Sequence, residues 1–388
     1  MKLRLLHVVP SYIPAWRYGG PIYSVHGLCK ALAARGHEVH VATTNVDGAG
    51  DTAVSLLEPV DIDGVKVHYF QSRRLRRLYY SPPMHRYLSA TMATWDLVHT
   101  HSVFLWPTTA AARLARSARK PYVVSPRGML VRDLIRRRQT VLKTLWIRAF
   151  ERRNIADAAA VHVTSRVEGE ELLALGLKPR RIFEVANGID MPDANVVAPE
   201  SQAADVALPD DYVLFLGRIS WKKGLDRLLR AIAPLGSIPL VVAGNDEEDF
   251  WPRMMRLAEE LGMARRVHYV GHVEGRRKER LLRRAAMLVL PSYSENFGNV
   301  VLEAMAAGTP VIVTREVGLA AALETHRSGI VVSGEARELS DAIASLHSDR
   351  GLRSSYADRG RIMAQAYSWD NIAAQIEEQY RAILDDPA

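Results

Sequence analysis

Two glutamates lie in a pattern that could recognise a phosphorylated ligand. Glu295 and Glu303 flank the predicted start of a helix within SENFGNVVLEAMAAGTPVIVT, residues 294–314. A buried strand that ends near Ser292 would present the first N–H groups of this helix, from Gly298 to Val300, at the edge of a sheet. Such a helix start attracts anions, and glycine lets a phosphate approach the backbone closely. Glu303, about 7 Å into the helix at ~1.5 Å per residue, would then reach the ribose of a nucleotide.

The same glutamates have a simpler interpretation. Taken singly, Glu295 could be a solvated loop carboxylate and Glu303 a helix-surface charge that is paired locally. Their combination with the preceding strand and with the small-residue turn Ala306-Ala307-Gly308 favours the binding site.

Two cations follow a second apolar strand in FLGRISWKKGLDRLL, residues 215–229. Arg218 and Lys223 would face the same edge of the sheet as the glutamates. Fixed guanidinium and ammonium donors stabilise negative charge that develops on a departing diphosphate. The alternative is that Lys222 and Lys223 are merely exposed at a helix start, where the helix dipole disfavours cations.

The elements that must hold these residues alternate between short apolar strands and helices, which predicts parallel α/β sheets. The second half of the chain contains six such strands, and ligands of these sheets bind beyond the carboxyl ends of the strands. The first half predicts a sheet of six or seven strands. Between the halves, residues 187–210 are rich in Asn, Gly, Pro and Asp and indicate a domain linker.

Several segments of the chain resemble those of a known family. The segments that carry the resemblance are GRISWKKG, PSYSENFGNVVLEAMAAGTPVIVT, YGGPIYSVHGLCKALAARGHEVHVAT, DLVHTHS and ANGID. They are similar to the retaining glycosyltransferases of family 4. The resemblance implies the GT-B fold, an α/β architecture of two Rossmann-like doubly wound domains with an interdomain cleft. It also implies an acceptor-side domain over residues 1–195, a nucleotide-sugar-binding domain over 196–368, and a final helix at 369–388 that crosses back to the first domain.

The resemblance assigns roles to individual residues. It implies that Arg218 and Lys223 hold the diphosphate, Glu295 the hydroxyls of the donor sugar and Glu303 the ribose. The other implied donor-binding residues come from a capping backbone segment, a loop along the nucleotide base and a flexible glycine loop: Phe297, Gly298, Asn299 and Val300; Val273; and Gly19 and Gly20.

One segment departs from many relatives. Where they have a histidine near the donor sugar, this chain reads SPRGML, with Arg127 in that place. SPRGML and the preceding HSVFLWP resemble a subgroup associated with surface polysaccharide synthesis. We interpret Arg127 as a substrate-positioning, catalytic cation, the alternative being an arginine bound to local carbonyls at a turn. His99 and His101 alternate on a buried strand; a core position is expected for one of them, and His101 is the candidate on the acceptor side.

The expected reaction follows from this resemblance. The family is thought to retain the anomeric configuration by departure and attack on one face, with the leaving phosphate helping to deprotonate the acceptor. We expect a hexose-type sugar from a UDP- or GDP-linked donor, a glycan or lipid-linked glycan acceptor, no cofactor and no metal. The string Asp61-Ile62-Asp63 precedes a strand and indicates a surface hairpin rather than a metal site.

Charge distinguishes the two halves. Residues 1–160 carry 24 Lys and Arg against 10 Asp and Glu, although the net charge of all 388 residues is +8. Neither a zinc-finger spacing nor an RNA-binding aromatic signature accompanies this charge, so we expect no nucleic acid partner. The basic stretch at 132–154 also contains Trp146 and Phe150 and resembles an interfacial helix for an anionic membrane surface. A solvated helix covering the sheet is the alternative.

A single cysteine, Cys29, and no apolar run of bilayer length indicate a cytoplasmic enzyme, with peripheral association with the inner membrane as a further hypothesis. Two other functions stay open. One is a GT-B nucleotide-sugar epimerase; a phosphorylase of that fold would need a pyridoxal-binding lysine context that we do not find. The other is a non-catalytic partner that binds a nucleotide or a glycan.

Overall fold

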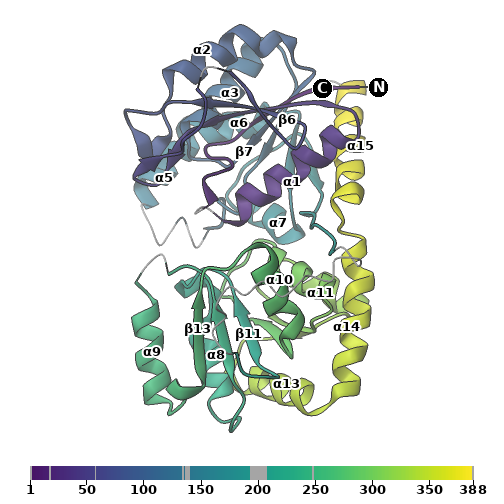
Figure 1. Cartoon of the computed structure of the whole chain (residues 1–388). Coiled ribbons are helices and arrows are strands. Elements are labelled where there is room, and N and C mark those ends of the chain that lie inside the picture. The colour runs from purple at the N-terminus through teal and green to yellow at the C-terminus, as the bar shows by residue number, and fades with distance from the viewer. Residues whose placement is uncertain are drawn as a thin grey trace. The chain divides into compact units, whose positions relative to one another are not determined.

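The computed structural model describes the chain except residues 1, 17–18, 57, 133–134, 136–139, 193–207, 247–248 and 387–388. The chain divides into two compact units (Figure 1). The N-terminal unit comprises Met1–Gly188 and Trp369–Ala388, and the C-terminal unit comprises Ile189–Ser368. The boundary predicted at 195/196 lies outside the described residues.

The N-terminal unit contains an eight-stranded sheet within its described residues, in the order β10-β9-β8-β7-β1-β2-β6-β5. Its strands are β1 (Arg4–Val8), β2 (Glu38–Thr44), β5 (Val60–Ile62), β6 (Val65–Phe70), β7 (Leu97–His101), β8 (Tyr122–Ser125), β9 (Ala160–Val163) and β10 (Ile182–Glu184), with a separate hairpin of β3 (Val46–Asp47) and β4 (Gly50–Asp51). Its helices are α1 (Gly20–Ala34), η2 (Arg76–Leu78), α2 (Pro82–Thr91), η3 (Met92–Thr94), α3 (Trp106–Ser117), α5 (Thr140–Trp146), the π-helix η4 (Ile147–Glu151), α6 (Arg152–Ala156), α7 (Arg166–Ala174) and α15 (Trp369–Asp385).

The sheet has eight strands where six or seven were predicted, and the strands that the sequence did not reveal are the two edge strands, β5 and β10. Each is three residues long and has a partly exposed or charged sequence, so the apolar pattern of a buried strand is missing. β5 pairs antiparallel with β6 through a turn at Asp63 and Gly64, so Asp61 and Asp63 belong to a hairpin, as predicted.

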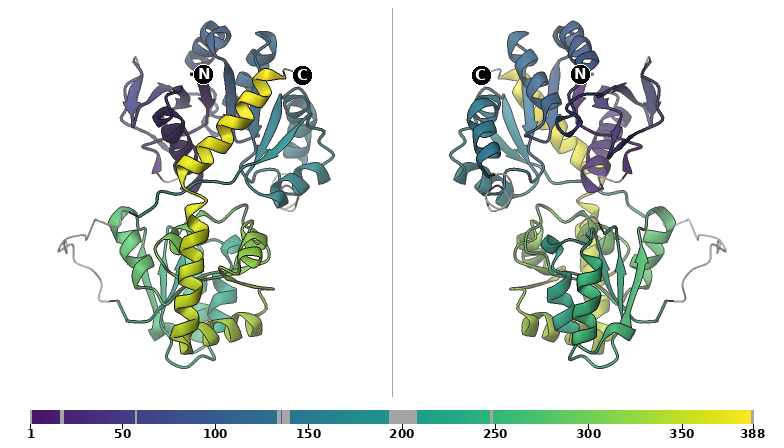
Figure 2. Two further views of the ribbon diagram at one scale, coloured as in Figure 1. Left: turned by 90° about the vertical axis from the view of Figure 1, so that its right-hand side faces the viewer. Right: turned by 90° about the vertical axis from the view of Figure 1, so that its left-hand side faces the viewer.

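The last helix, α15, belongs to the N-terminal unit and packs against α1 (Figure 2). Its first residue, Trp369, lies between two glycines. A Cβ atom on Gly27 would lie 2.1 Å from the Trp369 ring, and one on Gly188 would lie 2.3 Å from it. Glycine at both positions therefore makes room for the indole.

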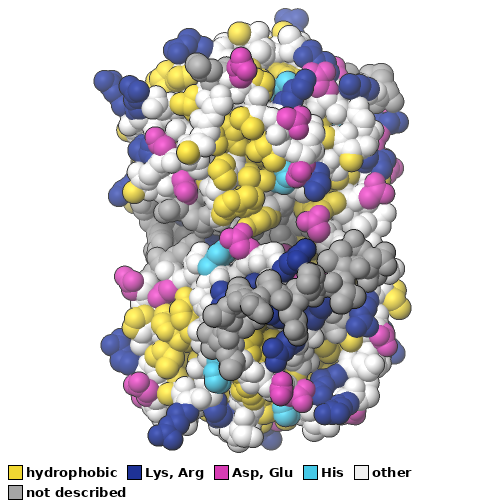
Figure 3. Space-filling view, viewed as in Figure 1, with side chains coloured by type: hydrophobic (Ala, Val, Ile, Leu, Met, Phe, Trp, Pro, Cys, Tyr) yellow, Lys and Arg dark blue, Asp and Glu magenta, His cyan; other side chains and the backbone are white. Residues whose placement is uncertain are grey.

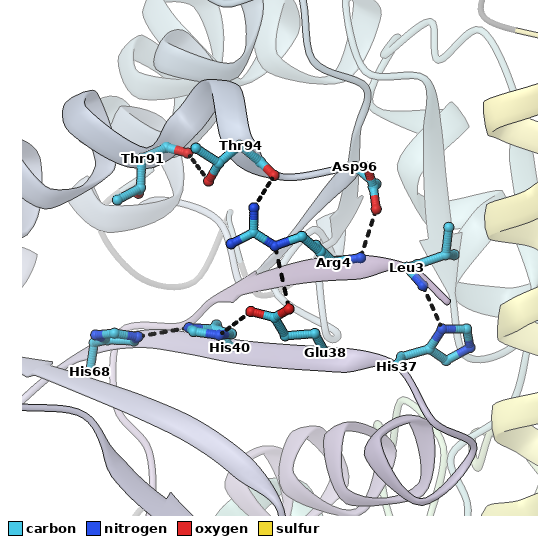
Figure 4. A network of polar contacts seen from close by, with 9 residues as sticks. All are labelled: Leu3, Arg4, His37, Glu38, His40, His68, Thr91, Thr94 and Asp96. Carbon is cyan, nitrogen blue, oxygen red and sulfur yellow. Dashed lines mark hydrogen bonds and ion pairs between the residues drawn. The ribbon is translucent and has the colours of Figure 1, made fainter. Parts of the chain in front are cut away.

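A polar network joins the first two strands near their amino ends (Figure 4). Arg4 donates to the Thr94 carbonyl at 3.0 Å and pairs with Glu38 at 3.4 Å. Glu38 in turn contacts His40, which bonds to His68 at 2.9 Å. Because ligands of parallel sheets bind beyond the opposite, carboxyl ends of the strands, we assign this network a structural role.

The C-terminal unit contains a fully parallel six-stranded sheet in the order β13-β12-β11-β14-β15-β16, and the six strands are those predicted. The strands are β11 (Val213–Leu216), β12 (Leu240–Ala243), β13 (Val267–Gly271), β14 (Met287–Leu290), β15 (Val311–Thr314) and β16 (Ile330–Val332). The helices are η5 (Trp221–Lys223), α8 (Leu225–Ile232), α9 (Trp251–Glu260), η6 (Ala264–Arg266), α10 (Gly275–Arg284), α11 (Asn299–Ala306), α12 (Ala320–His326), α13 (Ala336–Ser348) and α14 (Arg350–Gln365).

This strand order is that of the Rossmann fold. The central strands are continuously apolar because helices cover both faces of the sheet. The helix α8 shows why a sequence of this type packs there: Leu225, Leu228, Leu229 and Ile232 recur at helical spacing and are all buried.

Candidate active site

The candidate site of the C-terminal unit lies at the switch point of its sheet. The neighbouring strands β11 and β14 lead to opposite halves of the sheet, and such a point opens a crevice beyond the carboxyl ends of the strands. The loop after β11 carries Arg218 and Lys223, and the loop after β14 carries Glu295. The structure thus brings the predicted cations and this carboxylate to one edge.

Backbone contacts hold the two loops together. Gly224 has a φ of 69°, and a Cβ atom there would lie 2.0 Å from the Pro291 carbonyl oxygen. The Tyr293 N–H donates to the Lys222 carbonyl at 2.7 Å. A side chain at position 224 would therefore separate Lys223 from the glutamate loop, which explains the glycine in WKKG.

Lys223 and Glu295 form an ion pair across these loops, in which the ammonium donates to the carboxylate. Their side chains are 15% and 17% exposed, so the pair is shielded but accessible from one side. Glu295 is not the solvated loop carboxylate of the simpler interpretation.

A segment that the sequence reasoning missed fixes the backbone of Glu295. The Glu295 N–H donates to the Glu316 carbonyl at 3.1 Å, and the Gly318 N–H donates to the Glu295 carbonyl at 3.0 Å. A Cβ atom on Gly318 would lie 2.1 Å from the Asn296 carbonyl oxygen. The close approach of two chain segments explains the glycine at position 318. From the sequence alone, such a glycine cannot be distinguished from one in a turn.

The helix α11 begins directly after this loop. Gly298 precedes its first residue with a φ of 100°, in the left-handed region that favours glycine. The first turn of a helix has N–H groups without intrahelical acceptors, and these include the amide of Val300. The helix start is therefore built to receive an anion beside Glu295.

Glu303 is held by a partner from another helix. The Lys278 ammonium of α10 donates to the Glu303 carboxylate at 3.0 Å, and both side chains are about a third exposed. The sequence reasoning missed Lys278 because its contact with Glu303 spans 25 residues of the chain.

The remaining residues predicted to bind the donor differ in how exposed they are. Arg218 is exposed, directly beyond β11. Val273 and Phe297 are 6% and 4% exposed, so their side chains belong to the packing of the unit. The Phe297 carbonyl already accepts the Leu319 N–H at 3.2 Å.

In the N-terminal unit, the corresponding switch point lies between β1 and β7. His101 ends β7, and Arg127 follows β8 with a φ of 56°. The Arg127 guanidinium donates to Asn187 Oδ1 at 2.7 Å and to His101 Nδ1 at 3.1 Å. Its partners are thus two side chains, in contrast to the local carbonyls of the alternative interpretation. Burial lowers the pKa of Arg127 from its ordinary value.

His101 belongs to a cluster of buried histidines. His99 and His101 are both fully buried, so the prediction that only one is a core residue was wrong. Because Arg127 can only donate, His101 Nδ1 must accept. His101 Nε2–H then donates to His7 Nδ1 at 2.9 Å, and the proton of His7 lies on Nε2, a buried atom with no hydrogen-bond partner.

A second chain of hydrogen bonds starts from a carbonyl. The Val185 oxygen accepts from His162 Nε2, so Ser125 donates to His162, His99 donates to Ser125, and the Tyr380 hydroxyl donates to His99. Burial lowers the pKa of His7 and of His162 to about 3, so these imidazoles are neutral at physiological pH.

Three of these imidazoles, His7, His99 and His101, have ring nitrogens within 4.8 Å of one another, close enough to share a metal ion. Each nitrogen lone pair already accepts a hydrogen bond in the arrangement above, so a metal would displace Arg127, His101 or Tyr380. The expectation that no metal is required stays a prediction.

The predicted glycine loop lies at the start of α1. Gly19 precedes the helix with a φ of 67°, and a Cβ atom on either Gly19 or Gly20 would meet no atom within 4 Å. The open space is compatible with a ligand at this helix start, and the role of both glycines stays a prediction.

Known families match each half of the chain. Residues 19–188 match the glycosyl transferase 4-like domain, and residues 199–363 match the glycosyl transferases group 1 domain. These ranges cover most of the N-terminal and C-terminal units, respectively. The chain is a glycosyltransferase of the GT-B type.

Curated relatives agree with this assignment. The glycosyltransferase is 27% identical to an uncharacterized glycosyltransferase of Methanocaldococcus jannaschii over 95% of this chain and 97% of the relative. It is 32% identical to the D-inositol 3-phosphate glycosyltransferase of Mycobacterium tuberculosis over 61% of this chain, and it spans about half the length of that relative.

Solved structures share the fold of the glycosyltransferase. HepE from Anabaena, solved with UDP and glucose, has a TM-score of 0.74 at 20% identity over 98% of this chain and 99% of that one. Sucrose-phosphate synthase from Thermosynechococcus elongatus has a TM-score of 0.77 at 22% identity over 98% and 99%. Among the described residues of the glycosyltransferase, every helix is too short or too polar to span a bilayer.

Proposed function

We propose that this glycosyltransferase transfers a hexose from a UDP- or GDP-linked donor, with retention of configuration, to a glycan or lipid-linked glycan acceptor. The observation that carries the donor assignment is the Lys223–Glu295 ion pair beside the start of α11. A cation, a carboxylate and backbone N–H groups meet at one switch point, which is what a sugar diphosphate requires.

Donor binding exchanges the partners of these groups. The diphosphate takes the Lys223 ammonium and the first amides of α11, and Glu295 is freed to accept hydrogen bonds from the hydroxyls of the sugar. Glu303 accepts from the ribose hydroxyls and keeps Lys278 as its counter-ion. UDP-glucose is the first donor to test, because HepE, which shares the fold, has been solved with it.

The cations also support the departure of the nucleotide. Negative charge grows on the diphosphate as the glycosidic bond breaks, and Lys223 and Arg218 lie on the loop after β11, where they can stabilise this charge. The phosphate oxygen that leaves accepts the proton of the acceptor hydroxyl on the same face of the sugar. No cofactor or metal is used in this scheme.

The N-terminal unit supplies the acceptor side. His101 and Asn187 fix the Arg127 guanidinium as a charged donor at the end of β8, where it positions an oxygen-rich substrate. The SPRGML segment supports a role in the synthesis of a surface polysaccharide such as O-antigen, capsule or exopolysaccharide. We place the reaction in the cytoplasm, with an acceptor presented at the inner membrane.

The assignment is tested by substituting Glu295. Calorimetry with UDP-glucose and GDP-mannose identifies the donor, and turnover is then compared for the wild type and Glu295→Gln. Loss of the carboxylate should lower kcat/KM by on the order of 100-fold, from roughly 3 kcal/mol of lost transition-state stabilisation. Glu324→Gln, at an exposed position of α12 in the same unit, should change little.

Two results would contradict the proposal. Unchanged turnover of Glu295→Gln would remove the donor assignment, and an epimerised donor formed without acceptor would identify an epimerase instead. The anomeric configuration of the product, read by nuclear magnetic resonance, tests retention separately.

A further inference from the structure

A pocket with a volume of 660 Å³ opens beside α3 in the N-terminal unit. It shares no residue with the donor or acceptor sites described above. Its walls come from α2, α3, the end of α5, the π-helix η4 and α6, and the lining residues include Trp106, Trp146, Phe150, Arg113, Arg116 and Arg153. Single π-turns inside helices are frequent at functional sites.

The pocket has an excess of positive charge. Arg116 and Arg153 share one carboxylate, Asp157, at 3.7 Å and 3.3 Å. Arg113 adds a third, exposed guanidinium to the rim. Three guanidinium groups outnumber the two nearby carboxylates, Asp157 and the buried Glu151, and guanidinium geometry suits phosphate oxygens.

The wall of the pocket is built to stay in place. The buried Glu151 carboxylate accepts the Phe104 N–H at 2.9 Å and the Trp146 indole N–H at 3.0 Å. Asn154 also donates to Glu151 and uses its own oxygen to accept Arg116 at 3.1 Å.

Apolar side chains continue outwards from the pocket. Phe150 lines it and is 42% exposed, and Val141, Leu142 and Leu145 of the same helical stretch are 75%, 59% and 56% exposed. By contrast, Lys and Arg are scattered among acidic side chains on the face of the unit in Figure 3, so overall charge does not define a docking face there.

From these contacts we propose that the pocket binds a phosphorylated lipid. The phosphate lies between Arg113 and Arg116, and the hydrocarbon chain covers the exposed side chains of α5. A nucleotide or an acidic sugar would satisfy the guanidinium groups but would leave the aliphatic side chains in water. A lipid phosphate satisfies both, because its hydrocarbon chain removes these apolar side chains from water.

Calorimetry on the full chain tests the proposal with three probes at submicellar concentration. They are dioctanoyl phosphatidic acid, dioctanoylglycerol and inorganic phosphate. Phosphatidic acid should bind at least about tenfold more tightly than either of the others, since each of them lacks one half of the recognised structure. Equal or tighter binding of inorganic phosphate would identify a plain anion site, and equal binding of dioctanoylglycerol would show that the arginines play no part; either result overturns the assignment.

Variants locate the site. Arg113→Gln with Arg116→Gln should weaken phosphatidic acid binding at least about tenfold, whereas Arg74→Gln, an exposed arginine elsewhere in the unit, should not. An unchanged unfolding transition of the N-terminal unit in scanning calorimetry shows that a variant is folded, and this control does not depend on the donor site of the C-terminal unit. If a variant does not fold, the site is tested in the wild type instead. A chain-brominated phosphatidic acid that binds in the pocket should quench the tryptophan fluorescence. Absence of quenching, or full affinity in the double variant, would overturn the proposal.

Discussion

At the residue scale, each carboxylate predicted to bind the donor is already neutralised by a lysine from a different element. Lys223 holds Glu295 and Lys278 holds Glu303. Because these pairs are partly exposed, each adds little to the stability of the fold, on the order of 1 kcal/mol or less. Their effect is to hold both carboxylates in a fixed orientation before a ligand arrives.

The buried histidines make a prediction about stability and pH. Burial lowers the pKa of His7 and His162 to about 3, below the ordinary value of 6.5, so the unfolded chain binds more protons than the folded one between these limits. The stability that the neutral imidazoles of His7 and His162 contribute to the folded state is complete above pH 6.5 and is lost as the pH falls towards 3. Each should reduce the free energy of unfolding by up to about 1.4 kcal/mol per pH unit in this window.

Urea unfolding at pH 7.5, 6 and 5 measures this slope. His162→Gln should reduce the proton uptake on unfolding at pH 5 by about one proton. The same substitution at the exposed His326 is the matched control. Equal proton uptake by the wild type and His162→Gln would show that the imidazole is already protonated in the folded protein.

Residue types and spacing predicted the donor side chains but not their partners. The seven residues between Glu295 and Glu303, together with the strand and helix signals around them, form one local pattern. Lys278 and the segment from Glu316 to Gly318 come from other elements, and their contacts depend on how helices and loops pack after the sheet has formed. His162 joins the histidine cluster in the same way, through neighbouring strands.

At the element scale, the loop of Glu295 depends on its contact with Gly318. Gly318→Ala would place a Cβ atom 2.1 Å from the Asn296 carbonyl oxygen, so the loop must move. A shift of about 1 Å in a group that positions a substrate can cost on the order of 100-fold in rate. We expect Gly318→Ala to weaken donor binding and to lower kcat by up to that factor.

The control is an alanine at a glycine with room for it. A Cβ atom on Gly169 of helix α7 would meet Val163 at 3.7 Å, an ordinary contact. Gly169→Ala should therefore stabilise the protein by roughly 0.5–1 kcal/mol and leave turnover unchanged. If Gly318→Ala binds UDP-glucose and turns over like the wild type, the contact does not fix the loop.

Element prediction succeeded where the apolar runs were continuous, as in all six strands of the C-terminal sheet. It failed for β5 and β10 because short edge strands need no continuous apolar run. The helix predicted for the basic stretch at 132–154 is confirmed from residue 140 onward, and only the π-turn within it was not predicted. The described part of this stretch is α5, a π-turn and α6, with residues 133–134 and 136–139 outside the description. A π-turn shifts the rotational phase of a helix, and the spacing of apolar residues in the sequence gives no simple indication of this shift.

At the scale of the whole molecule, the N-terminal unit is discontinuous in sequence and the C-terminal unit is not. The chain leaves the first unit after Gly188 and returns to it at Trp369. On return, α15 buries Ile372, Ile376 and Ile383, and Tyr380 donates its buried hydroxyl to His99. The last helix of the chain therefore completes the core of the N-terminal unit.

This arrangement predicts an asymmetric effect of truncation. A chain that ends at Ser368 loses six buried residues of α15, of which the four large apolar side chains contribute about 1.5–3 kcal/mol each and so roughly 6 kcal/mol or more. That is comparable to the whole stability of a typical domain, about 5–15 kcal/mol. Scanning calorimetry should show the transition of the N-terminal unit lost, while the transition of residues 189–368 remains.

A chain that ends at Asp386 is the control, because it keeps α15 and removes only Pro387 and Ala388. Limited proteolysis supplies a second measurement: the 1–368 chain should be cleaved throughout the N-terminal unit and yield a resistant fragment close to 189–368. Resistance of both units in the 1–368 chain would mean that the N-terminal core is stable without α15. In that case the packing of Trp369 between Gly27 and Gly188 would not be needed for the stability of the N-terminal unit, contrary to what these contacts indicate.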